Sequence, residues 1–122
     1  MSEPSSDQRI AQSGTGREIS PRDAIGIDRQ SAGAPAFLDV REPNEWNLFR
    51  IPGAVHIPVG RLTVQSLEAA GVDPQRALIV YCGRGNRSMN ATNTLSDAGR
   101  GNVQSLSGGI MAWIDAGGEV EE

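Results

Sequence analysis

The cysteine at position 82, the only one in the chain, opens a segment whose residues favour negative charge. It is followed by Gly83-Arg84-Gly85-Asn86-Arg87, and a helix is predicted from Ser88 onward. Two glycines allow a tight turn in which successive backbone N–H groups converge on one point. Those N–H groups, the helix N-terminus and the two arginines all attract an anion. A thiol in such surroundings has a pKa of roughly 3.5–7.5, so we predict an activated nucleophile that needs no neighbouring histidine.

A second interpretation treats the same segment as ordinary structure, with Cys82 as a buried apolar thiol between a strand and a helix. Two glycines and two arginines directly after an apolar run favour the nucleophile. Arginine is charged at any working pH and can fork around an oxyanion. The residues expected to bind the substrate are Gly83, Arg84, Gly85, Asn86, Arg87 and Ser88.

Short apolar runs alternate with helical segments along the chain. Strands are predicted at 36–40, 54–57, 77–81 and 102–106. Helices are predicted from residue 21, and at 43–49, 64–70, 88–98 and 110–116. This alternation indicates an α/β domain with a mainly parallel sheet. Ligands bind beyond the carboxyl ends of parallel strands, which singles out Asp39 and Arg41 as well as Cys82.

The composition excludes several classes of function. One cysteine and one histidine leave no disulfide and no Cys-rich zinc site, so neither a metal nor another cofactor is expected. The basic residues are all arginine, which excludes Schiff-base chemistry on a lysine. A net charge of −4 disfavours general binding to nucleic acid. No apolar run approaches the ~20 residues that span a bilayer, and the first residues lack a secretory signal, so we expect a cytoplasmic protein without a membrane partner.

The 122 residues suit one small domain. Residues 1–17 are rich in Ser, Gly, Gln and charge and cannot bury enough apolar surface to fold. We therefore predict a disordered tail or a linker at 1–17, and a folded domain at 18–122.

Four stretches in order resemble the single-domain rhodanese-like sulfurtransferase family. They are Leu38-Asp39-Val40-Arg41-Glu42, the segment 51–58 (IPGAVHIP), the segment 81–88 (YCGRGNRS) and the segment 102–113 (NVQSLSGGIMAW). The loop alone is moderately specific, whereas the ordered set is strongly specific. The resemblance implies a small, twisted, mainly parallel sheet with helices on both faces.

The resemblance also implies a cycle of sulfur transfer. The Cys82 thiolate would attack the outer sulfur of thiosulfate or a similar anionic donor, release sulfite and carry the sulfur as a persulfide. A thiophilic acceptor, such as cyanide or a cellular thiol, would then take it. In the alternative reading the domain is a sulfur-relay module that passes persulfide sulfur from a protein donor to a carrier protein. The histidine that the family usually shows before Ile-Pro-Gly is replaced here by Phe49-Arg50. Rhodanese domains fused to sulfur-carrier adenylating enzymes show a similar variant.

A third reading, a small dual-specificity phosphatase, fits less well. The loop from Cys82 to Arg87 is six residues long, one shorter than the phosphate-binding loop of that family. Asp39 and Arg41 are expected to support the loop, either by orienting it and adding charge or as a purely structural hydrogen bond and salt bridge. The single histidine, His56, is expected to be a packed strand residue.

Overall fold

The computed structural model describes residues 17–122, so all but the last residue of the predicted tail lie outside the described residues. Five parallel strands form one sheet in the order β1-β5-β4-β2-β3. The strands are β1 (Glu18–Ile19), β2 (Ala36–Asp39), β3 (Val55–His56), β4 (Leu78–Tyr81) and β5 (Val103–Leu106). Each predicted strand is present, slightly trimmed at its ends. The fold class is therefore confirmed as α/β with a parallel sheet.

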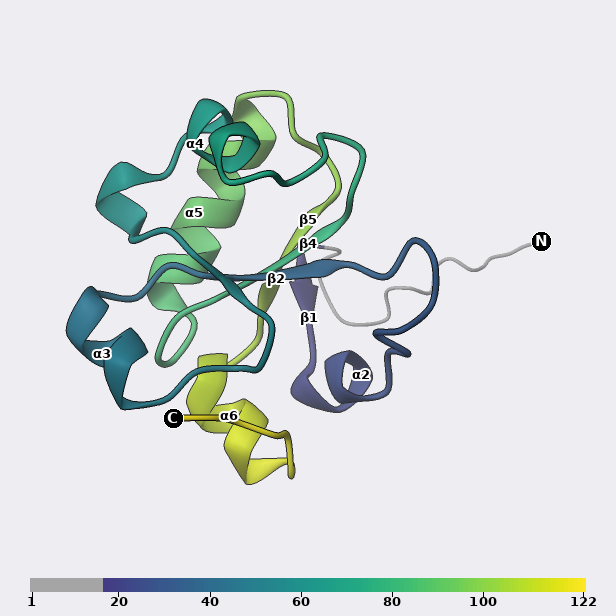
Figure 1. Cartoon of the computed structure of the whole chain (residues 1–122), viewed down its shortest axis with the longest axis vertical. Helices are drawn as coiled ribbons and strands as arrows, with labels where there is room; N and C mark the ends of the chain where they lie inside the picture. Colours follow the sequence, from purple (N-terminus) through teal and green to yellow (C-terminus); the bar gives the residue numbers. More distant parts are fainter. Residues whose placement is uncertain (1–16) are drawn as a thin grey trace.

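Helices cover both faces of this sheet (Figure 1). They are α2 (Pro21–Ile25), α3 (Pro43–Leu48), α4 (Val64–Ala69), α5 (Asn86–Asp97) and α6 (Gly109–Asp115), with a 3₁₀ turn η1 (Val59–Arg61). One apolar cluster joins the sheet to α4 and α5, and a second joins the opposite face to α2 and α6. Among the described helices, none has both the length and the apolar character needed to cross a membrane.

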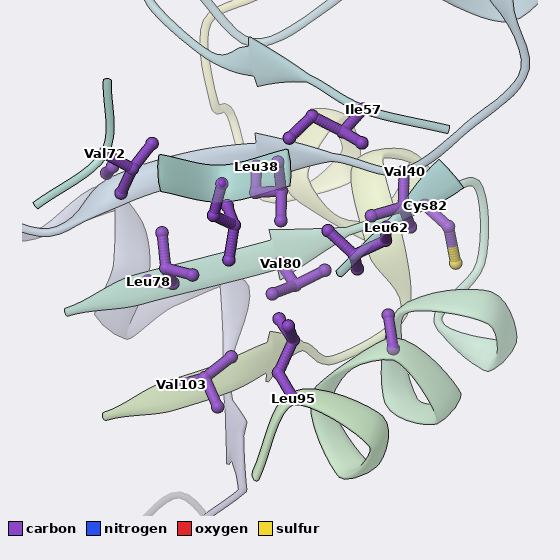
Figure 2. Close-up of a cluster of buried hydrophobic side chains, with 13 residues drawn as sticks. Leu38, Val40, Ile57, Leu62, Val72, Leu78, Val80, Cys82, Leu95 and Val103 are labelled. Carbon is purple, nitrogen blue, oxygen red and sulfur yellow. The ribbon is translucent and has the colours of Figure 1, made fainter. Parts of the chain in front are cut away.

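The two clusters follow from alternation along the buried strands. In β4, Leu78 and Val80 contribute to the cluster that contains Leu95 of α5, and Ile79 and Tyr81 contribute to the other. Cys82 continues this alternation on the α5 side. Figure 2 shows its sulfur at one end of the buried apolar cluster.

Besides the short 3₁₀ turn η1, which was not predicted, two elements differ from the sequence-based expectation. Strand β1 was not predicted, because two residues are too few to show any periodicity; they pair with Ser105 and Leu106 at the edge of the sheet. Helix α5 begins at Asn86 rather than Ser88, after Gly85 in a left-handed conformation with a φ of 110°. The earlier start places Asn86 and Arg87 within the first turn of the helix instead of in the loop.

Candidate active site

The carboxyl ends of β2 and β4 open into a cavity of about 410 Å³. Its lining comes from the end of β2, from α3, from the loop after β4 and from the starts of α5 and α6. The lining residues are Arg41, Glu45, Leu48, Phe49, Cys82, Gly83, Arg84, Asn86, Arg87, Ile110 and Met111. Five of the predicted substrate-binding and catalytic residues therefore line one cavity, together with Arg41. Gly85 and Ser88 are not among the lining residues, but their amide nitrogens contact the Cys82 sulfur.

The Cys82 sulfur accepts hydrogen bonds from the loop that surrounds it. The Gly85 amide nitrogen lies 3.1 Å from Sγ, and the Ser88 amide nitrogen lies 3.3 Å from it. While it carries its proton, the thiol in turn donates to the Ser88 hydroxyl oxygen, 3.5 Å away. These are the converging N–H groups that the glycine-rich segment predicted, and they point at the sulfur itself.

These contacts set the acidity of the thiol. Burial of the sulfur acts to raise the pKa of Cys82. Hydrogen bonds from the Ser88 side chain and amide, and from the amides of Gly85 and Arg84, act in the opposite direction. The hydrogen bonds outweigh burial, so the pKa of Cys82 lies below its ordinary value.

The outer side of the cysteine loop is bound by helix α6. The Ile110 amide donates to the Cys82 carbonyl at 2.9 Å, and the Met111 amide donates to the Gly83 carbonyl at 3.2 Å. Gly109 permits this close approach, because a Cβ there would overlap the Gly83 carbonyl. Because α6 binds the carbonyls of Cys82 and Gly83, these carbonyls face α6, whereas the amides of Gly85 and Ser88 point at the sulfur.

The two arginines of the loop have different surroundings. Arg87 forms a two-point ion pair with Glu45 of α3, with N–O distances of 2.7 and 3.1 Å. That pair holds the pKa of Glu45 at about 2. Arg84 is exposed and has no hydrogen-bond or ion-pair partner in the part of the chain that the structure describes. The sequence predicts two positive charges beside the sulfur, from Arg84 and Arg87. In the structure the charge of Arg87 is balanced by Glu45, a residue that the sequence did not indicate as part of the site.

Asp39 and Arg41 form a buried ion pair under the cavity. The Arg41 guanidinium contacts both carboxylate oxygens of Asp39 at 2.8–3.1 Å and donates to the Phe49 carbonyl at 2.6 Å. His56 Nε2 lies 2.9 Å from the Arg41 carbonyl, and its ring stacks on Trp46. Asp39, Arg41 and His56 therefore make structural contacts with one another or with the backbone, and Arg41 also lines the cavity.

A thiol with a lowered pKa, held by a loop at a helix N-terminus beyond a parallel strand of an α/β protein, is an arrangement suited to nucleophilic chemistry. The family model of the rhodanese-like domain matches residues 26–116. The chain belongs to the rhodanese-like domain family.

Similar proteins differ widely in length. The chain is 37% identical over 104 residues to the probable adenylyltransferase/sulfurtransferase MoeZ of Mycobacterium tuberculosis, covering 84% of this chain and 26% of that protein. It is 29% identical to thiosulfate sulfurtransferase 18 of Arabidopsis thaliana, covering 88% of each chain. A solved thiosulfate sulfurtransferase from Pseudomonas aeruginosa superposes with a TM-score of 0.76 at 27% identity, covering 95% of this chain and 22% of that one.

Proposed function

We propose that this domain is a sulfurtransferase that carries sulfane sulfur as a persulfide on Cys82. The thiolate attacks the outer sulfur of thiosulfate or a comparable anionic donor. The sulfur–sulfur bond of the donor breaks, and sulfite leaves with the electron pair. A nucleophilic acceptor then attacks the terminal sulfur of the persulfide; cyanide gives thiocyanate, and a thiol gives a new persulfide. The Cys82 thiolate is regenerated, so the cycle needs no cofactor.

The observation that carries this proposal is the set of donors aimed at the sulfur. Each state of the cycle places negative charge at or next to Cys82 Sγ, first on the thiolate and later on the persulfide. The Gly85 and Ser88 amides already point there. Fixed dipoles of this kind are worth roughly 3–4 kcal/mol per donor in other enzymes. Arg84, at the mouth of the cavity, supplies positive charge for the anionic donor.

Mass spectrometry after thiosulfate treatment tests the proposal. The wild-type protein should gain one sulfur atom, lose it on addition of cyanide, and form thiocyanate over many turnovers. Cys82→Ser should lose both the adduct and the turnover, at least about a thousandfold. Ser107→Ala, which changes a serine outside the cavity lining, serves as the matched control and should keep both. Full turnover by Cys82→Ser would sink the mechanism.

A second candidate function is a relay between proteins. Leu48 lies on the rim of the cavity with 66% of its surface exposed, which suits contact with a partner surface. The chain also matches 26% of a protein named as a probable adenylyltransferase/sulfurtransferase. In this function a protein persulfide supplies the sulfur and a sulfur-carrier protein receives it. The cytoplasm, where free thiols stay reduced, is the compartment that we propose for either function.

Competing donors separate the two functions. Transfer to Cys82 is measured from a desulfurase persulfide and from free thiosulfate under the same conditions. A large preference for the protein donor, reduced by Leu48→Ser, favours the relay. Equal or faster transfer from thiosulfate, unaffected by Leu48→Ser, favours the small-molecule enzyme. Hydrolysis of an aryl phosphate that depends on Cys82 would instead support the phosphatase reading.

A further inference from the structure

A buried serine lies behind the cysteine loop where an apolar residue is expected. Ser105 is in β5, two residues after Val103, and therefore on the same face of the sheet. Val103 belongs to the apolar cluster beside α5. Ser105 is 1% exposed, so its hydroxyl has no access to water. Burying a hydroxyl costs free energy unless it finds a hydrogen-bond partner.

That partner is the serine that contacts the catalytic sulfur. The two hydroxyl oxygens of Ser88 and Ser105 lie 2.7 Å apart. This is the single hydrogen bond of the Ser105 side chain within residues 17–122. The Ser88 hydroxyl also lies 3.2 Å from the Gly85 carbonyl and 3.5 Å from Cys82 Sγ. A continuous line of contacts therefore runs from β5 through α5 to the sulfur.

Either hydroxyl could donate in the Ser88–Ser105 contact. Only one arrangement gives both hydroxyl hydrogens an acceptor among the described residues: Ser105 donates its single hydrogen to Ser88 Oγ, and Ser88 donates elsewhere. The Ser88 hydrogen is then directed away from Ser105. Two acceptors are left for it, the Gly85 carbonyl and the sulfur of Cys82. When the sulfur is an anion it is the stronger acceptor of the two.

We propose that Ser105 is a positioning residue for the sulfur chemistry: by donating to Ser88, it turns the Ser88 hydroxyl hydrogen toward Cys82 Sγ and stabilises the anionic sulfur. A hydroxyl that accepts one hydrogen bond is also a better donor of its own. The expected effect of Ser105 on turnover rests on the proposed function. Its expected effect on the acidity of the Cys82 thiol does not, and applies to any reaction of Cys82.

Four charged side chains line the cavity, namely Arg41, Glu45, Arg84 and Arg87, and Asp39 lies beneath it in its pair with Arg41. Neither β5 nor α6 adds a charged side chain to the lining. The two serines approach from the protein interior and carry no charge. The Ser88 side chain is the largest of the contacts that lower the pKa of Cys82. Replacing Ser105 therefore tests a contribution that leaves the charges of the site unchanged.

The experiment is the pH profile of Cys82 alkylation by iodoacetamide, followed by mass spectrometry. One cysteine in the chain makes the signal specific to this thiol. Ser105→Ala should raise the inflection by about half to one pH unit, and slow alkylation below the inflection by about threefold to tenfold. Thr92→Val is the matched control, because Thr92 is a buried α5 hydroxyl with no hydrogen-bond partner among the described residues. Its profile should coincide with that of the wild type.

Two further variants test the path of the effect. Ser105→Thr keeps the hydroxyl and should keep the wild-type profile. Ser88→Ala should shift the profile at least as far as Ser105→Ala, and the double variant should shift it no further than Ser88→Ala alone. An unchanged profile in Ser105→Ala, an equal shift in Thr92→Val, or additive shifts in the double variant would overturn the proposal. Alkylation requires no sulfur donor, so these outcomes are independent of whether thiosulfate is a substrate.

Discussion

Two carboxylate–arginine pairs border the same cavity in opposite environments. The Asp39–Arg41 pair lies beneath it, with side chains that are 0% and 3% exposed. The Glu45–Arg87 pair lies at its edge, with side chains that are 29% and 38% exposed. Both pairs have two-point contact geometry, so the difference between them is burial. In a buried pair, each charge is stabilised only by its partner, so loss of one partner leaves the other charge buried and unpaired. In an exposed pair, water stabilises whichever charge remains.

This difference assigns the two pairs to different tasks. The buried pair fixes the end of β2 and, through the Phe49 carbonyl, the chain that follows α3. The exposed pair joins α3 to α5 and neutralises Arg87 beside the sulfur. We therefore expect the first pair to control stability and the second to control the charge that a donor meets.

The largest effect is expected from Asp39→Asn. This change leaves the Arg41 guanidinium buried without a counter-charge, so the free energy of unfolding should fall by about 3–5 kcal/mol. Urea unfolding at neutral pH measures the loss. Asp97→Asn removes the same charge from an exposed position at the end of α5 and should change stability by less than about 0.5 kcal/mol. Equal losses in the two variants would contradict the division of tasks.

A smaller effect, on activity rather than stability, is expected from Glu45→Gln. The amide keeps the shape and the acceptor oxygen of Glu45 but removes the charge that neutralises Arg87. The kcat/KM for thiosulfate should rise by about threefold, and more at low ionic strength, because the dianion then meets two free cations. Glu68→Gln, an equal charge change on exposed α4 outside the cavity lining, is the control. A decrease in kcat/KM would show that the Glu45 charge assists the reaction.

The smallest effect is the acid sensitivity of the Glu45–Arg87 pair. The pKa of Glu45 is about 2 in the folded chain against 4.5 for the free group, so ionised Glu45 stabilises the folded state above about pH 4.5. That stabilisation is lost as the pH falls toward 2. It amounts to less than about 1 kcal/mol, because water screens the pair. Urea midpoints between neutral pH and about pH 3 should fall less steeply in Glu45→Gln than in the wild type.

Much of this fold could be predicted from local patterns. The apolar runs that became β2 and β4 are short and nearly continuous, as buried parallel strands are, and glycines and prolines separate the elements along the chain. The cysteine loop could be predicted equally well. Two glycines directly before a helix imply a tight turn whose backbone amides converge on one point, here the Cys82 sulfur. The start of α5 was misplaced by two residues, since Gly85 both ends the loop and begins the helix.

The rest depends on contacts between distant segments. Glu45 and Arg87 are 42 residues apart, and nothing at either position indicates the other. Ser105 is a polar residue in a strand whose pattern requires an apolar one, and that departure is a signal. The role of Ser105 could not be predicted from the sequence, because it depends on a hydrogen bond to Ser88 of α5 that only the folded structure shows.

The bonds between α6 and the cysteine loop also bear on how charge changes during a reaction. Ile110 and Met111 hold the carbonyls of Cys82 and Gly83 from outside, so the peptide groups of the loop are oriented before any donor arrives. Water around a free thiolate must rearrange each time charge appears or moves on the sulfur. Here the dipoles around the sulfur are already oriented when the chain folds. A larger residue at Gly109 would separate α6 from the cysteine loop, so we expect the loop to reorient during the reaction and the activation free energy to rise.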